Sequence, residues 1–358
     1  MCIAILTTTH PAYRYIIINN RDEFLSRPTA PATWWTPSPS PSSSSPPTHL
    51  PVPSIKIPHI LSARDLARPA HGTWLGVTKE GRVAVLTNCL EKSCARAVGL
   101  RSRGGIIKGW LTAERTTATA FSEAAGEGEE RSAVKDFIEE LRADKDLGSV
   151  GGFNLLFGDL SESQDDGLVI ISNRATDSEC CSGDSVVVRK IEDGTVGNGQ
   201  TVAVSNMTLA EEFDEGEKWK KISLGEELMA KAVQESLQAS ENENALVERL
   251  FDVLATDTLP RLPADASAEA YLGLFEESIF VPAVGKKVHH ENHDQADWNA
   301  TLLDPSYMEG LYGTQTQTVI LIGYDGRVRF IARTLYDEEG RPLEKEKSDR
   351  SFEFMVER

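Results

Sequence analysis

Short runs of apolar and β-branched residues, separated by turn residues, dominate the pattern of this chain. Residues 2–8 and 13–19 form two such runs on either side of His10-Pro11-Ala12, which predicts a β-hairpin. The second run includes Tyr15-Ile16-Ile17-Ile18 and is apolar on both faces, as expected of a strand between two packed layers. Further hairpins are predicted over residues 73–87 and 318–334.

Helical patterns lie between groups of predicted strands. Strands are expected at 153–157, 168–171, 186–191 and 202–204, and helices at 105–114, at 132–145 and within 208–256. The last region carries a predicted apolar stripe of Leu224, Leu228, Val233 and Leu237. Hairpins make antiparallel sheets, and strands that are apolar on both faces need a layer on each side. The pattern therefore predicts an α+β fold: a four-layer αββα sandwich of two antiparallel sheets.

Two segments interrupt this pattern. Residues 37–58 are rich in Pro, Ser and Thr and cannot bury enough apolar surface to fold, so they are predicted to be a disordered insertion. Residues 115–131 are rich in Gly and Glu and are predicted to be a surface loop. No internal repeat is visible, and we expect residues 1–358 to form a single domain with insertions.

The composition excludes some classes of function. The chain has 37 Lys and Arg against 55 Asp and Glu, a net charge of -18, which repels phosphate backbones and argues against nucleic-acid binding. Its apolar start is too short for a signal-peptide core, and no run approaches the roughly 20 residues of a membrane-spanning helix. The 5 cysteines include an adjacent pair and do not form a disulfide framework. A cytoplasmic protein with at most peripheral membrane contact is expected.

Cys2 is the first candidate for chemistry. A small second residue permits removal of Met1, which would leave the thiol and a free α-amine on the same residue. An α-amine titrates at about 7.7–8.0 and can act as the base that activates the thiol. In the alternative, Cys2 only begins an edge strand, and its thiol packs as a small apolar group.

A polar cluster, Asn20-Arg21-Asp22-Glu23, ends the second predicted strand, and the hairpin returns it to the neighbourhood of Cys2. A nearby cation lowers the pKa of a thiol, and a carboxylate holds an ammonium. Strand alternation places Asn20 and Asp22 on one face and Arg21 on the other, so we expect Cys2 to face Asn20 and Asp22 unless a bulge intervenes. In the alternative, these charges are only a solvated strand end.

A run of histidines, His289-His290-Glu291-Asn292-His293, could suggest a metal site. Structural metal sites draw their ligands from spaced, rigid positions, whereas this run lies in a polar stretch. A solvated loop is predicted here, and no metal site is expected.

Several motifs in this chain occur together in one family. They are Met1-Cys2-Ile3, Asn20-Arg21-Asp22-Glu23-Phe24, Ser26-Arg27-Pro28, Gly72-Thr73-Trp74-Leu75-Gly76-Val77, Leu86-Thr87-Asn88, Ser102-Arg103-Gly104, Gly152-Phe153-Asn154-Leu155, Ser205-Asn206 and Tyr312-Gly313-Thr314. In these residues the chain resembles the NRDE family, also called the transport and Golgi organisation protein 2 family. The motifs follow the family's order from residue 1 to beyond residue 330.

The resemblance implies a fold similar to that of the N-terminal-nucleophile hydrolases, whose cysteine members include penicillin V acylase and bile salt hydrolase. It implies Cys2 as nucleophile, with Asp22, Asn88 and Arg21 as the other catalytic candidates: Asp22 would hold the α-amine and Asn88 would donate to an oxyanion. Substrate-binding candidates are Asn20, Asn154 and Asn206. The chain departs from these relatives at two positions. The acylases carry an Arg several residues before the Asp, and many family members have an Arg where this chain has Gln315.

Two classes of function follow. The resemblance implies a role in protein secretion and Golgi organisation through handling of haem, lipid or acyl-CoA, in the cytoplasm with association to Golgi or mitochondria. The alternative is a cysteine amidohydrolase that acts on a small amide or acyl substrate. Neither class requires a resident cofactor. Haem as a cargo would need an axial ligand, for which Cys2 or one of the 7 His residues is the source.

Overall fold

The computed structural model describes residues 1–35, 59–90, 101–113, 132–161, 167–174, 186–192, 194, 199–209, 218–286, 310–337 and 339–357. The predicted disordered insertion at 37–58, the predicted surface loop at 115–131 and the histidine run at 289–293 lie outside the described residues. None of the helices within the described ranges is long and apolar enough to cross a membrane.

The described strands form two antiparallel sheets. In spatial order, sheet A contains β10 (Thr201–Val204), β1 (Ile3–Thr7), β2 (Tyr13–Phe24), β11 (Tyr312–Gly323), β12 (Arg327–Thr334) and β13 (Asp349–Met355). Sheet B contains β3 (Thr29–Trp34), β4 (Ile60–Asp65), β5 (Leu75–Thr78), β6 (Arg82–Asn88), β7 (Phe153–Asp159), β8 (Val169–Ser172) and β9 (Val187–Lys190).

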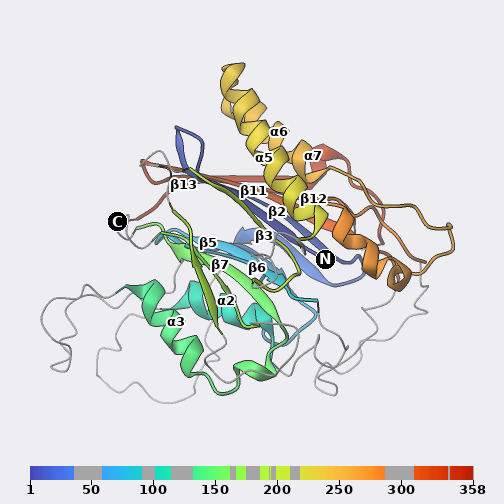
Figure 1. The fold of residues 1–358 in the computed structure, drawn as a ribbon, viewed down its shortest axis with the longest axis horizontal. Helices are drawn as coiled ribbons and strands as arrows, with labels where there is room; N and C mark the ends of the chain where they lie inside the picture. The colour runs from blue at the N-terminus through green and yellow to red at the C-terminus, as the bar shows by residue number, and fades with distance from the viewer. Residues whose placement is uncertain are drawn as a thin grey trace, which may run out of the picture.

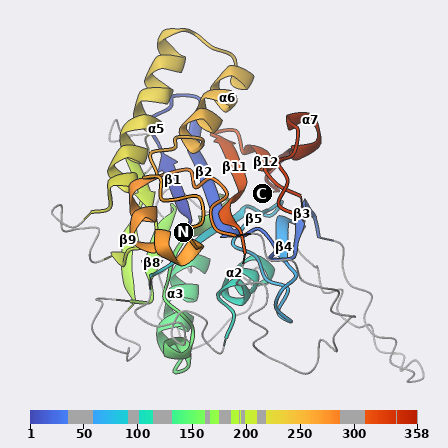
Figure 2. The ribbon, with the colours of Figure 1, turned by 90° about the vertical axis from the view of Figure 1, so that its right-hand side faces the viewer.

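Helices cover the outer faces of both sheets. Sheet A carries α5 (Lys220–Gln238) and α6 (Glu243–Leu254), with the 3-10 helix η5 (Ala268–Glu277) beside the N-terminus. Sheet B carries α2 (Arg103–Thr112) and α3 (Ala133–Ala143), followed by the short 3-10 helix η1 (Leu147–Ser149), while α7 (Lys345–Ser348) lies against β12. Figures 1 and 2 show the two helical layers on opposite sides of the packed sheets. The predicted α+β, four-layer αββα sandwich is confirmed.

Alternation along the strands divides the core into layers. In β1 the side chains of Ala4 and Leu6 pack between the sheets, whereas Ile3 and Ile5 pack against the helices on sheet A. The predicted strand that is apolar on both faces follows the same rule, since Ile17 of β2 lies between the sheets and its neighbours lie under α5 and α6.

The apolar stripe predicted for the region 208–256 is confirmed in part, because Val233 is buried and Leu224 and Leu228 pack against the same core cluster. Leu237, however, is 41% exposed, and α5 buries Ile222, Gly225 and Met229 beside Val233. The cause is the close approach of α5 to β1: a Cβ at Gly225 would lie 2.8 Å from Cδ1 of Ile5. Only a residue without a side chain allows this contact, and the helix is therefore rotated toward its glycine.

A charged cluster fastens α6 to sheet A. Glu243, the first residue of α6, accepts hydrogen bonds from Arg327 and Arg329 of β12 and, at 2.7 Å, from the hydroxyl of Tyr13 in β2. These donors, led by Arg327, lower the pKa of Glu243 to about 2 from the ordinary value of 4.5.

Replacing Glu243 with glutamine is expected to make the free energy of unfolding less dependent on pH in the acid range. A lowered carboxyl pKa stabilises the fold above the ordinary pKa, and this contribution is lost as pH falls from about 4.5 toward 2. Glu243→Gln should therefore lower the free energy of unfolding by about 2 kcal/mol at pH 7, with the difference vanishing near pH 2. Urea unfolding across pH measures this, with Glu140→Gln on the exposed face of α3 as control. A difference that is constant across pH would contradict the assignment.

Candidate active site at the N-terminus

The N-terminus lies inside the molecule, at the end of sheet A nearest η5. Met1 and Cys2 are each only 9% exposed. The ammonium of Met1 donates to the hydroxyl of Tyr312 at the start of β11 and lies 3.5 Å from Oδ2 of Asp22 in β2. The first residues of the chain are thus held by a strand from its last part (Figure 2).

Asp22 is fixed by β11. Oδ1 of Asp22 accepts a hydrogen bond of 2.7 Å from the hydroxyl of Thr314, and its carbonyl accepts one of 3.2 Å from Tyr312. The same carbonyl lies 3.7 Å from Sγ of Cys2. Thr314 pairs directly with Asp22, and the register then shifts by one residue so that Thr316 pairs with Arg21. This β-bulge leaves Gln315 unpaired in the ladder.

Burial dominates the electrostatics of the site. It raises the pKa of the Cys2 thiol, against the opposing effect of the N-terminal ammonium. It lowers the pKa of the N-terminal amine, which Asp22 opposes, and it raises the pKa of Asp22, which the ammonium and Lys221 oppose. An amine with a lowered pKa is more often the free base at neutral pH, the form that can take a proton from a thiol.

Arg21 lies on the face of β2 opposite to that of Asp22. Its guanidinium stacks 4.0 Å from the ring centroid of Trp74, donates to the side-chain oxygen of Gln315 and lies 3.9 Å from Glu23. Since Ile3 pairs with Asn20, Cys2 is opposite Arg21 across the hairpin and shares its face. The positive charge of Arg21 helps to lower the pKa of the Cys2 thiol, although burial prevails.

The prediction that Cys2 faces Asn20 and Asp22 is wrong, because their side chains lie on the other face of β2 and Sγ of Cys2 meets only the backbone carbonyl of Asp22. Asn20 is fully buried, and its amide donates to the carbonyls of Leu254 and Ile279 and accepts from Gln317. The register explains this, because the partner of Asn20 is Ile3, which points into the helical layer. In this structure Asn20 joins β2 to the end of α6.

The other predicted asparagines surround a loop that follows β10. Ser205 in this loop donates a 2.8 Å hydrogen bond to the carbonyl of Cys2. Asn154 holds the loop by donating to the carbonyls of Ser205 and Met207, and Asn206 donates to the carbonyl of Asn88. Asn154 and Asn206 are buried and bind backbone, whereas Asn88 at the end of β6 is exposed.

Sequence reasoning missed four residues that contact this site: Ser205, Lys221, Tyr312 and Thr314. Three of them lie in the motifs quoted above, but no pattern within those motifs assigns them a partner. Lys221 is fully buried and donates a 3.0 Å hydrogen bond to the carbonyl of Met1. Burial lowers the pKa of Lys221 to about 8, and the negative charge of Asp22 opposes this. In the sequence, the one sign of its role is that this lysine lies next to Ile222 on the buried face of α5.

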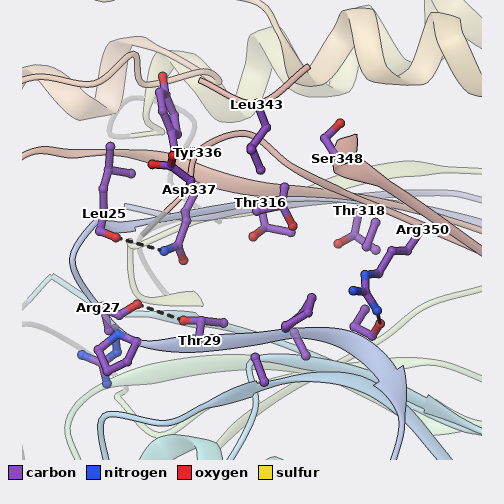
Figure 3. Close-up of a pocket in the computed structure, with 18 of the residues that line it drawn as sticks. Leu25, Arg27, Thr29, Thr316, Thr318, Tyr336, Asp337, Leu343, Ser348 and Arg350 are labelled. Atoms are coloured by element: carbon purple, nitrogen blue, oxygen red, sulfur yellow. Dashed lines mark hydrogen bonds between the residues drawn. The ribbon is translucent and has the colours of Figure 1, made fainter. Parts of the chain in front are cut away.

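A cavity of about 460 Å³ lies between the sheets, next to the residues that contact Arg21. Trp74 and Gln315, which contact Arg21, form part of its wall. Figure 3 shows Thr316 and Thr318 on one side of the cavity and Thr29 on the other. Its remaining lining is mainly apolar and hydroxyl-bearing, a composition typical of small-molecule sites.

The described residues contain no group of three or more His, Cys, Asp or Glu side chains arranged to hold a metal ion. The polar groups that surround Cys2 within these residues are an amine, a carboxylate, hydroxyls and a lysine. Such a set can move protons and stabilise charge.

The sequence profile of the family described as Transport and Golgi organisation 2 matches residues 1–337. The chain therefore belongs to this family, as its motifs suggested. It is 26% identical over 365 residues to an uncharacterised protein of Saccharomyces cerevisiae, covering 99% of this chain and 100% of that one. It is also 26% identical over 329 residues to the Transport and Golgi organization protein 2 homolog of Homo sapiens, covering 92% of this chain and 89% of that one.

Two solved structures are similar at low sequence identity. The N-acylethanolamine-hydrolyzing acid amidase ortholog of Caenorhabditis elegans matches with a TM-score of 0.40 and 11% identity, over 78% of this chain and 90% of that one. A variant of the conjugated bile acid hydrolase of Clostridium perfringens matches with a TM-score of 0.42 and 7% identity, over 99% of this chain and 98% of that one.

Proposed function

We propose that this member of the Transport and Golgi organisation 2 family is a cysteine amidohydrolase whose nucleophile is Cys2. The observation that carries the proposal is the buried ion pair at the N-terminus, where Asp22 and Tyr312 hold the α-amine of Met1 beside Cys2, the residue just before β1. Burying a carboxylate and an ammonium costs desolvation free energy. Such buried charges cluster at functional sites, where they take part in the chemistry.

The reaction begins when removal of Met1 moves the α-amine to Cys2. This amine takes the thiol proton, and Sγ attacks the carbonyl carbon of an amide. The C–N bond then breaks, the leaving amine takes the proton from the ammonium, and a thioester remains. Water, deprotonated by the same amine, hydrolyses the thioester and restores the thiol. In this scheme Asp22 holds the amine, Arg21 favours the thiolate, and the exposed amide of Asn88 donates to the oxyanion.

The first test is whether the mature protein begins at Cys2. Intact mass should show that Met1 is absent. Both cysteines are buried in the structure with Met1, and once Met1 is removed a thiol-directed probe should label Cys2 faster than Cys89. A library of acyl amides should then reveal turnover. Retention of Met1 would sink the proposal, because the amine would not be on the nucleophile's own residue.

A second candidate function is the binding of a small amphipathic molecule such as a lipid or an acyl-CoA. The cavity between the sheets favours it, because its volume of about 460 Å³ lies in the range of small-molecule sites. Its described lining includes no His, Cys or Met, so haem could take only Tyr336 as an axial ligand there. Saturable stabilisation of the purified protein by a lipid or by haem tests this function. Absence of a shift in melting temperature for every such ligand would count against it.

A further inference from the structure

Met1 occupies a complete binding site, in which each of its chemical groups has a partner. Its ammonium is bound by Tyr312 and Asp22, and its carbonyl by Lys221. Its side chain packs in an apolar cluster, called here the methionine pocket. The pocket is formed by Leu259, Tyr271, Phe275, Val281 and Val284. Removal of Met1 empties this pocket and leaves Lys221 without the carbonyl that it binds.

We propose that the methionine pocket is the acyl-binding site for the substrate. The inference rests on the proposed function and names its substrate class: amides of short, unbranched, uncharged acyl groups. The carbonyl of Met1 is joined to the nitrogen of Cys2, so the emptied site lies next to the α-amine of the residue that carries the nucleophile. A substrate carbonyl bound there meets Lys221, a buried donor within hydrogen-bond reach of an oxygen at that position.

The charge of the site selects an uncharged acyl group. After Met1 is removed, the α-amine of Cys2 is the natural partner of Asp22. A substrate with its own ammonium would add a third buried positive charge, beside those of the Cys2 ammonium and Lys221, to a single carboxylate. An unpaired buried charge is costly, so an α-aminoacyl group is disfavoured.

The pocket also limits the length of the acyl chain. Aromatic rings line it, since Phe275 lies 6.1 Å from Tyr271 and 5.1 Å from Tyr312, centroid to centroid. A hexanoyl group has the chain length of methionine from its carbonyl carbon to its terminal methyl. Hexanoyl amides should therefore fill the space that methionine leaves, whereas shorter chains leave a void and longer ones meet the rings.

A binding experiment tests the site without requiring catalysis. Protein that begins at Cys2 is compared with protein that retains Met1, prepared while methionine aminopeptidase is inhibited, and hexanamide is the probe. Hexanamide should raise the melting temperature of the first form in a saturable way and leave the second unchanged, because Met1 already fills its pocket. Equal shifts in both forms, or none in either, would overturn the proposal.

A kinetic experiment tests the same site in turnover. Among the 4-nitroanilides of acetic, butanoic, hexanoic and decanoic acids, kcat/KM should be highest for hexanoyl, about tenfold above acetyl and decanoyl. Phe275→Ala should move this optimum to longer chains, and Leu272→Ala, at a position on η5 that is 48% exposed, should not. An optimum that Phe275→Ala leaves in place would contradict the assignment. Selective binding of hexanamide without hydrolysis of any anilide would support the pocket and refute the proposed hydrolase.

Discussion

Cys2→Ser in the protein that begins at residue 2 is expected to lower kcat for amide hydrolysis by at least about 10³-fold. The α-amine can take the proton of a thiol before attack, whereas a serine hydroxyl is far less acidic and gives up its proton only as it attacks, in a site formed around sulfur. The serine is close to isosteric, so the fold and the melting temperature should change little. The measurement is the rate of hydrolysis of the best amide from the acyl library, with folding checked by circular dichroism.

Cys89 provides a matched control for this substitution. It is likewise a buried cysteine, 4% exposed, and its Sγ lies 3.7 Å from Oδ1 of Asn154. A hydroxyl can make the same contact, so Cys89→Ser should retain most of the activity. Equal losses of activity in the two variants would show that activity depends on packing around buried sulfur. That result would contradict the role of Cys2 as nucleophile.

Asp22→Asn is expected to lower kcat by about 10²-fold and to move the acidic limb of its pH profile to lower pH. The variant keeps the oxygen that accepts from Thr314 and removes only the negative charge. In the structure that charge raises the pKa of the Met1 amine against the effect of burial, and we expect it to act in the same direction on the amine of Cys2. Without it the pKa falls, so the amine becomes the free base at a lower pH but is held less firmly.

The pH dependence separates this role from a purely structural one. Asp349→Asn removes a carboxylate that binds Arg333 at the start of β13, away from the N-terminus. It should lower stability without moving the pH profile of kcat. An unchanged profile in Asp22→Asn, or a shift of its acidic limb to higher pH, would contradict the assignment of Asp22 to the amine.

Much of the fold could be predicted from local pattern. The hairpins of β1 with β2, β5 with β6 and β11 with β12 lie where alternation and turn residues placed them. Three strands were not predicted: β3 and β4, which flank the segment 37–58, and β13. β3 contains Pro31 and buries only Ala32, so its sequence does not resemble a buried strand. In β13 only Phe352 and Phe354 alternate with polar residues, which is a weak signal.

The candidate site was only partly predictable, because its geometry depends on partners that are distant in sequence. Position and residue type drew attention to Cys2 and Asp22, and hairpin pairing brought them together. The bulge at Gln315 could not be predicted, yet it lets β11 bind Asp22 through Thr314 and Arg21 through Gln315. Arg21 and Gln315, the two positions noted as departures in the sequence, therefore contact each other. No local sequence pattern predicts this contact.

The burial of Met1 limits the time during protein synthesis in which an aminopeptidase can remove it. Tyr312, which closes the site, is separated from Met1 by 311 positions along the chain. Ribosomes add about 5–20 residues per second, so Tyr312 is made roughly 15–60 seconds after the first residue. Only in this interval is the N-terminus certain to be open to an aminopeptidase. Cells that translate quickly or lack sufficient aminopeptidase should therefore accumulate a folded form that permanently retains Met1.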